Sequence, residues 1–211
     1  MSSSCFIFDF DCTLTISHWY YFLENFNHWK QNYENIDENM ENISNIISKF
    51  KYQNFKFELC KYILKNKFPN FLILLRKYFL GDIQRNENLK TFFDLIDKSS
   101  YDIFIVSRGY KYDIELFLYF FKFRHIKKVY ARKLNNKYIQ KNIYFKNLVL
   151  KGYNIIKYID DDHSDHLEFK KLIKINKYNI DYVFYDLLEK EGTGINLNII
   201  YKLLSNLIIY S

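Results

Sequence analysis

Short runs of apolar residues alternate along much of this chain with longer segments in which apolar residues recur every three or four positions. The runs 5–8 and 103–106 contain only apolar residues, and such runs are typical of strands that are buried on both faces of a parallel sheet. The segment 86–98 shows the other pattern, with its apolar side chains on one face of a helix. Strands that alternate with helices in this way predict an α/β protein with a mostly parallel sheet.

The alternation extends to the end of the chain. We predict strands at about 5–8, 101–106, 128–131, 155–159 and 182–185. We predict helices at about 86–98, 112–121, 142–150, 167–175 and 197–208. In parallel α/β sheets the ligand site lies outside the carboxyl ends of the strands, so the residues that directly follow these strands are the candidates for chemistry.

The segment from residue 17 to residue 82 keeps helical spacing and shows no strand alternation. Gly81 and Asp82 mark its end. We therefore predict two units, a core of residues 1–16 and 83–211 and a helical cap at residues 17–82. The predicted fold class is α/β, a Rossmann-like and mostly parallel sheet core with an inserted helical cap.

Acidic residues follow two of the predicted strands. Asp9 and Asp11 come after the first strand, and Asp160 and Asp161 come after the fourth. Two carboxylates about 4 Å apart repel by about 4 kcal/mol at an effective dielectric constant of about 20, so a site that holds all four needs a cation or shared protons. Several carboxylates with few neighbouring His or Cys ligands suit Mg²⁺. A hard divalent ion in turn suggests a phosphate substrate.

These residues resemble the motifs of the haloacid dehalogenase (HAD) superfamily of aspartate-nucleophile phosphohydrolases. Its first motif, an apolar strand followed by D-x-D-x-T, is matched by Asp9 to Thr13. With 14 Asp and 4 Thr in the chain, that pattern is expected by chance only about 0.02 times. A strand that ends in Ser or Thr is matched at Ser107, and a strand that ends in paired acids is matched at Asp160 and Asp161, with Asp165 four residues later.

The resemblance implies a catalytic role for three of the matching positions. Asp9 would attack phosphorus and form an aspartyl-phosphate, which divides one difficult displacement into two easier ones. Asp11 would protonate the leaving oxygen and later deprotonate the water. Ser107 would donate a hydrogen bond to a phosphoryl oxygen. An acid at position 11 accompanies phosphatases and phosphomutases of the family, whereas its ATPases carry Thr there.

The resemblance also implies a Mg²⁺ site. The ion would be held by the carboxylate of Asp9, the main-chain carbonyl of Asp11 and the carboxylate of Asp161. Asp160 and Asp165 are further candidate ligands from the same acidic motif.

A lysine near the start of the helix before the fourth strand completes the family pattern by neutralising charge on the transferring group. Lys141, Lys146 and Lys151 all precede that strand. We prefer Lys146, because the segment 144–148 resembles the corresponding segment of the carboxyl-terminal-domain phosphatase branch. Lys141 is the second choice.

Together, these features predict a Mg²⁺-dependent phosphatase that hydrolyses a phosphate monoester through an aspartyl-phosphate. The size of the cap favours a small metabolite, nucleotide or sugar phosphate as the substrate. Three alternatives stay open: a phosphomutase or phosphotransferase with the same intermediate, a nucleic-acid-end or protein phosphatase, and a catalytically silent binding protein of the same fold. The predicted partner is a phosphorylated small molecule, and the oligomeric state is left open.

Composition and charge change this interpretation little. The net charge is +7, but the abundance of Lys, Asn, Ile, Phe and Tyr matches AT-rich codons, so nucleic-acid binding is only weakly supported. The charge would still attract an anionic substrate. No segment resembles a membrane span or a secretory signal. Three cysteines without C-x-x-C spacing fit a reducing compartment, so we expect a cytoplasmic protein.

Overall fold

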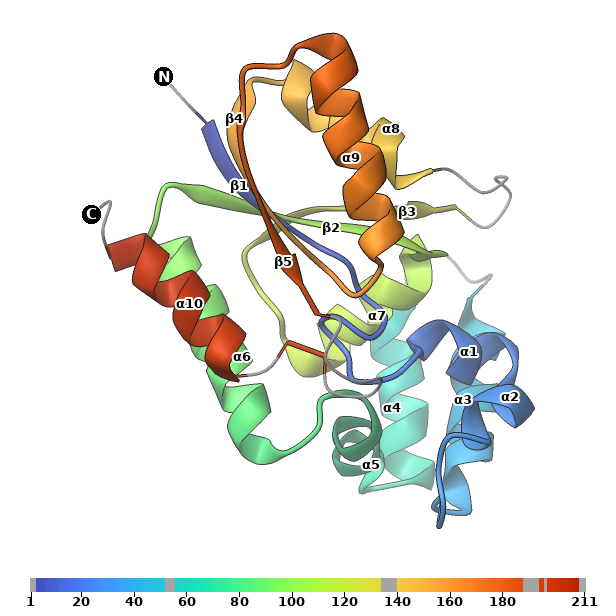
Figure 1. Ribbon diagram of the computed structural model, residues 1–211. Coiled ribbons are helices and arrows are strands. Elements are labelled where there is room, and N and C mark those ends of the chain that lie inside the picture. Colours follow the sequence, from blue (N-terminus) through green and yellow to red (C-terminus); the bar gives the residue numbers. More distant parts are fainter. Residues whose placement is uncertain (1–2, 52–55, 134–139, 188–193, 196, 209–211) are drawn as a thin grey trace.

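The central element of the protein is a parallel sheet of five strands. The computed structural model describes residues 3–51, 56–133, 140–187, 194–195 and 197–208. The strands lie in the order β3-β2-β1-β4-β5, and each neighbouring pair is parallel (Figure 1). Their bounds are Ser3–Phe8 for β1, Tyr101–Tyr110 for β2, Ile126–Arg132 for β3, Tyr153–Asp160 for β4 and Asp181–Asp186 for β5. This is the predicted α/β fold class.

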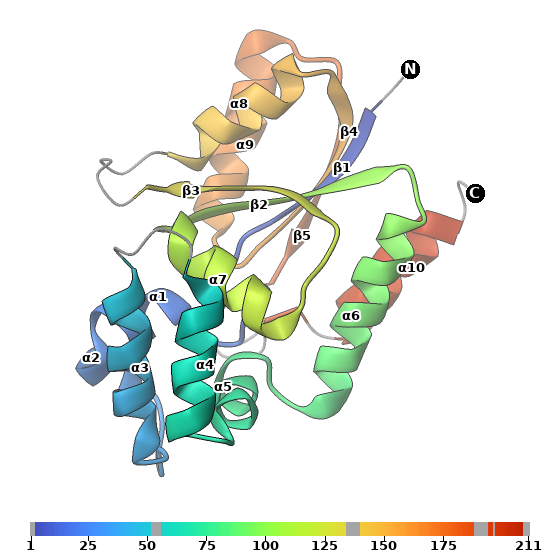
Figure 2. The ribbon, with the colours of Figure 1, turned by 180° about the vertical axis from the view of Figure 1, so that it is seen from behind.

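Helices cover both faces of the sheet (Figures 1 and 2). Helices α6, α7 and α10 lie on one face, and α8 and α9 lie on the other. Their bounds are Ile83–Asp97, Lys111–Phe121 and Leu197–Ile208, then Lys141–Leu150 and His163–Asn176. None of the helices in the described ranges is long and apolar enough to cross a membrane.

The strand β1 shows why its sequence contains only apolar residues. Phe6 and Phe8 point into the core beneath α6 and α7, whereas Cys5 and Ile7 point into the core beneath α8 and α9. All four side chains are fully buried. Because consecutive side chains of a strand point to opposite faces, a central strand between two helical layers needs an apolar residue at every position.

Five further helices lie between β1 and α6, and they gather on one side of the molecule (Figure 1). They are α1 (Trp19–Glu24), α2 (Phe26–Lys30), α3 (Asn39–Phe50), α4 (Phe57–Lys67) and α5 (Phe71–Phe79). These residues are helical, as their spacing predicted. Their aromatic core continues into the core of the sheet, since the ring of Trp19 packs against Phe79 and against Phe117 of α7. The division into a core unit and a cap unit stays a prediction.

Strand β2 is longer than predicted, as is α9, which begins at His163 and not at residue 167. The prediction ended this strand at Val106, but β2 continues to Tyr110, where it pairs with Arg132 at the end of β3. The register shifts between Val106 and Tyr110. The apolar pattern of the sequence stops before the end of the strand because Ser107 and Gly109 lie inside β2 but face the site described below.

A buried ion cluster joins α7 to the helices that precede it. Lys51 is 4% exposed, forms an ion pair with Glu24 and lies 3.8 Å from a carboxylate oxygen of Asp113. The main-chain carbonyl of Asp113 also accepts a hydrogen bond of 2.9 Å from the indole of Trp19. Burial raises the pKa of Asp113 to about 7, although Lys51 opposes this rise.

We expect Asp113→Asn to become more stable relative to the parent protein as the pH rises. The pKa of Asp113 is higher in the folded chain than in the unfolded chain, so folding favours the neutral carboxyl. This contribution to stability is complete below the unfolded pKa and is lost as the pH rises through about 7. Asparagine has the shape of the neutral carboxyl and does not ionise. Between about pH 5 and pH 8 the variant should therefore gain about 2 kcal/mol over the parent.

Urea denaturation of both proteins at the two pH values measures this gain. Glu87→Gln serves as the control, because Glu87 is exposed on α6 and its substitution should shift the stability equally at both pH values. A difference between Asp113→Asn and the parent that does not change with pH would contradict the expectation.

Candidate active site

Two neighbouring strands, β1 and β4, bring the acidic motifs together. The amide of Asp9 donates a hydrogen bond of 3.0 Å to the carbonyl of Ile159, so the pairing of β1 with β4 continues one residue beyond Phe8. This places Asp9 beside Asp160, the last residue of β4. Asp9 is 6% exposed and Asp160 is fully buried.

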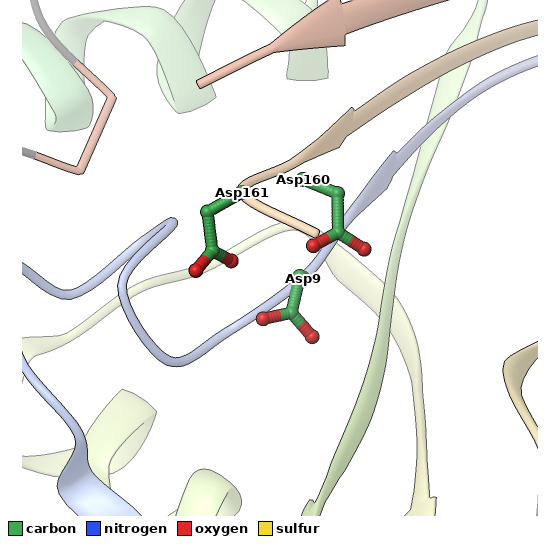
Figure 3. A group of neighbouring side chains, drawn as sticks. All are labelled: Asp9, Asp160 and Asp161. Carbon is green, nitrogen blue, oxygen red and sulfur yellow. The ribbon is translucent and has the colours of Figure 1, made fainter. Parts of the chain in front are cut away.

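Asp9, Asp160 and Asp161 form a group of three carboxylates (Figure 3). One carboxylate oxygen of each residue lies within 4.8 Å of the other two. Burial and the nearby charge of Asp9 raise the pKa of Asp160 well above its ordinary value. Three carboxylate oxygens at this separation match the oxygen-rich ligand sets that hold Mg²⁺, so the residues present fit the predicted ion.

Lys141, the first residue of α8, reaches this group from the side. Its ammonium lies 2.8 Å from an oxygen of Asp9, 2.7 Å from Asp160 and 2.9 Å from Asp165. The side chain is only 3% exposed. Burial opposes its charge, but the three carboxylates outweigh that effect and raise the pKa of Lys141. Lys141 is therefore a cation that is buried among carboxylates.

The preference for Lys146 in the sequence analysis requires a correction, because the structure places Lys141 in the site. Lys146 is exposed on α8. Each residue of a helix turns by about 100°, so a residue five positions after Lys141 points to a different side of the helix. Lys151 follows the end of α8, and its ammonium donates to the hydroxyl of Tyr130.

The side chain of Asp11 lines the cavity beside the three-carboxylate group but is not part of that group. One of its oxygens accepts hydrogen bonds of 2.7 Å and 3.4 Å from the amides of Trp19 and Tyr20, at the start of α1. Burial, followed by the charge of Asp9, raises the pKa of Asp11 to about 8. Of the predicted ligands, the side chains of Asp11 and Asp165 are outside the group; Asp165 forms ion pairs with Lys141 and Arg108.

Ser107 lies in β2 on the other side of the same space. It is 3% exposed, and its hydroxyl oxygen accepts a hydrogen bond of 3.1 Å from the amide of Gly109. A Cβ atom at Gly109 would lie 3.5 Å from that oxygen and 3.6 Å from an oxygen of Asp11. A longer side chain at Gly109 would therefore enter the space between Ser107 and Asp11.

Comparison with solved structures identifies the fold around these residues. The HAD domain of effector protein Lem4 from Legionella pneumophila matches 99% of this chain and 97% of its own length, with a TM-score of 0.61 and 18% sequence identity. An inactive mutant of the same domain matches 99% of this chain and 96% of its own length, with a TM-score of 0.61 and 17% identity. The chain has the fold of a HAD domain. No family model and no curated protein sequence matches it.

The HAD fold of this chain has an open cavity of about 700 Å³ beside the carboxylates. It is lined by the predicted residues Asp9, Asp11, Ser107, Asp160 and Asp161, by Lys141, and by further residues that include Tyr20, Tyr21, Arg108 and Arg132. The first group comes from the carboxyl ends of β1, β2 and β4, as the topology of a parallel sheet requires. Tyr20 and Tyr21 come from α1, so the predicted cap contributes to the wall of the cavity.

Arg85 is a supporting residue that the sequence analysis missed. It lies in α6, is 8% exposed, and donates hydrogen bonds of 2.9–3.2 Å to four main-chain carbonyls. The acceptors are Thr13, Leu14, Leu80 and Ile195. Arg85 thus ties the loop that carries Asp9 and Asp11 to the end of the inserted helices. Arginine is scarce in this chain, with only five residues. This scarcity was the sequence feature that could have drawn attention to Arg85.

Proposed function

We propose that this protein is a Mg²⁺-dependent phosphatase that hydrolyses phosphate monoesters, with Asp9 as the nucleophile. The observation that carries the proposal is the meeting of Asp9, Asp160 and Asp161 with the ammonium of Lys141 at one wall of a cavity. A phosphoryl group needs positioning and charge neutralisation more than covalent assistance. This set of residues supplies both.

Asp9 and Asp11 divide the chemistry between them. A carboxylate oxygen of Asp9 forms a bond to phosphorus while the bond from phosphorus to the ester oxygen breaks, and Asp11 gives its proton to that departing oxygen. Water then attacks the phosphorus of the aspartyl-phosphate, and Asp11 takes the proton of the water. Phosphate leaves and Asp9 is restored. The orientation of Asp11 by the amides of Trp19 and Tyr20 supports this role.

The remaining residues of the site stabilise charge. Lys141 lies against Asp9 and neutralises negative charge as the phosphoryl group arrives. The hydroxyl of Ser107 accepts from Gly109 and can donate its own proton to a phosphoryl oxygen. Asp9, Asp160 and Asp161 would hold Mg²⁺, which would neutralise and orient the oxygens of the phosphoryl group.

The dimensions of the cavity support a small molecule as the substrate. Pockets for small molecules generally measure about 300–1,000 Å³, and the cavity here has about 700 Å³. Tyr20 and Tyr21 of α1 belong to its lining. A metabolite, nucleotide or sugar phosphate fits this space better than the surface of a protein does.

Removal of the metal tests the proposed function. Purified protein should release phosphate from p-nitrophenyl phosphate with Mg²⁺ present, and EDTA should lower the rate by at least about 100-fold. Excess Mg²⁺ should restore it. A panel of phosphorylated metabolites, nucleotides and phosphopeptides then defines the substrate class, and an added alcohol acceptor distinguishes hydrolysis from transfer.

Two results would count against the proposal. One is failure to release phosphate from any ester of the panel with Mg²⁺ present. The other is a rate that EDTA leaves unchanged, because the three-carboxylate group would then have no metal-dependent function.

A further inference from the structure

Arg132 occupies the part of the cavity wall that is built by the ends of β2 and β3. It is the last residue of β3 and pairs with Tyr110, the last residue of β2. The carbon of its guanidinium lies 4.0 Å from the centre of the Tyr110 ring and 5.6 Å from the centre of the Tyr20 ring. Arg132 and Tyr20 line the same cavity as Asp9.

These contacts place the guanidinium against the faces of two tyrosine rings, whose centres lie 5.9 Å apart. A guanidinium that stacks on aromatic rings keeps its N–H groups in the plane, where they can bind a carboxylate or phosphate in a bidentate manner. Nε of Arg132 is buried and has no hydrogen-bond acceptor among the described residues. Buried donors are generally satisfied, so this atom points to an acceptor that comes from elsewhere.

Arg132 forms no ion pair with the residues that the structure describes, although its charge is near enough to Asp113 to lower the pKa of that carboxyl. Within the described ranges, no carboxylate oxygen lies within 4.0 Å of its guanidinium nitrogens. Arg108, the other arginine of the cavity, forms ion pairs with Asp162 and Asp165.

The neighbouring cation also has its own acidic partners. Lys51 lies 3.7 Å from the centre of the Tyr110 ring, but its ammonium is paired with Glu24 and lies near Asp113. Among the described residues of this wall, Arg132 is thus a cation without an ion pair and can attract an anion.

We propose that Arg132, held against the rings of Tyr110 and Tyr20, binds a second anionic group of the substrate. This inference rests on the proposed function: the phosphoryl group would lie at Asp9, and a carboxylate or second phosphate of the same molecule would lie at Arg132. The substrate would then be a phosphate monoester that carries a second anionic group, and esters without such a group, such as simple alkyl phosphates, would be poor substrates.

Matched pairs of esters test this inference. The first pair is 3-phosphoglycerate and glycerol 3-phosphate, which differ only by a carboxylate in place of a hydroxymethyl group. The second pair is 4-carboxyphenyl phosphate and phenyl phosphate, which place the carboxylate farther from phosphorus. We expect the parent protein to favour the carboxylate in at least one pair by about 10- to 100-fold in kcat/KM, the range of a charged hydrogen-bonded pair.

Arg132→Gln should remove that preference. It should lower kcat/KM for the favoured carboxylate ester about 10- to 100-fold more than for the partner ester that lacks the carboxylate. Arg132→Lys should keep part of the preference, because the charge remains while the bidentate geometry is lost. Arg124→Gln is the matched control, because Arg124 is exposed and outside this cavity, and it should leave the preference unchanged.

The inference is overturned if the parent shows no preference in either pair, or if the preference survives in Arg132→Gln. Absence of turnover with every ester, including p-nitrophenyl phosphate, would instead contradict the proposed function. Calorimetry with Asp9→Asn protein decides the inference in that case as well. Its Kd for the carboxylate ester should be lower than for the ester without the carboxylate, and the added Arg132→Gln substitution should abolish the difference. Equal Kd values for the two esters in both proteins overturn the inference.

Discussion

Asp9→Asn is expected to abolish phosphate release, with kcat reduced by at least about 1,000-fold. The amide of asparagine cannot form the bond to phosphorus, and it also removes the charge that pairs with Lys141 across 2.8 Å. Phosphate release from p-nitrophenyl phosphate measures the loss. Protein that is quenched with acid during turnover of a radiolabelled ester should carry a hydroxylamine-sensitive label in the parent and none in the variant.

Asp162→Asn is the matched control for this substitution. Asp162 lines the same cavity, but it accepts from the amide of Ser164 at the start of α9 and pairs with Arg108. Asparagine caps a helix about as well as aspartate does, so this variant should retain most of the activity and form the labelled intermediate. A labelled Asp9→Asn protein would show that another residue is the nucleophile.

Lys141→Met is expected to have the second-largest effect, on stability as well as on rate. Methionine leaves Asp9, Asp160 and Asp165 without the ammonium that lies within 2.9 Å of each. Removal of one partner from a buried ion pair generally destabilises a protein by about 3–5 kcal/mol. Loss of a cation beside the transferring phosphoryl group should also lower kcat by at least about 100-fold. Urea denaturation and initial rates measure the two effects.

Lys146→Met on the same helix provides the comparison. Because Lys146 is exposed, its replacement should change the free energy of unfolding by no more than about 0.5 kcal/mol and leave kcat almost unaffected.

The Lys141→Met variant should also recover part of its stability at lower pH, since protonation of the carboxylates removes the repulsion among them. The opposite ranking, with Lys146 essential and Lys141 dispensable, would restore the preference that the sequence motif suggested.

The strands, the helices and the acidic motifs could be predicted from the sequence, because each depends on residues that are close together along the chain. Buried parallel strands require unbroken apolar runs, and helices repeat every three or four residues. The predicted meeting of Asp9 with Asp160 also followed, since residues that end neighbouring parallel strands must lie at one edge of the sheet. The comparison with a solved HAD domain confirms the fold that these patterns predicted.

The tertiary structure decided which side chains point into the site. Three lysines, Lys141, Lys146 and Lys151, lie in α8 or directly after it, but the rotation of the helix brings only Lys141 to the carboxylates. Asp11 turns toward α1 because the amides of Trp19 and Tyr20 offer hydrogen bonds there, a contact across eight or nine residues.

Arg132, Tyr110 and Tyr20 meet from three elements that are far apart in sequence. Periodicity along the chain describes which face of an element is apolar. The direction of a single polar side chain depends on the partners that packing brings to it. The sequence therefore predicted the acidic centre, whereas the choice of Lys141 over Lys146 and the contact of Arg132 with Tyr110 and Tyr20 required the folded protein.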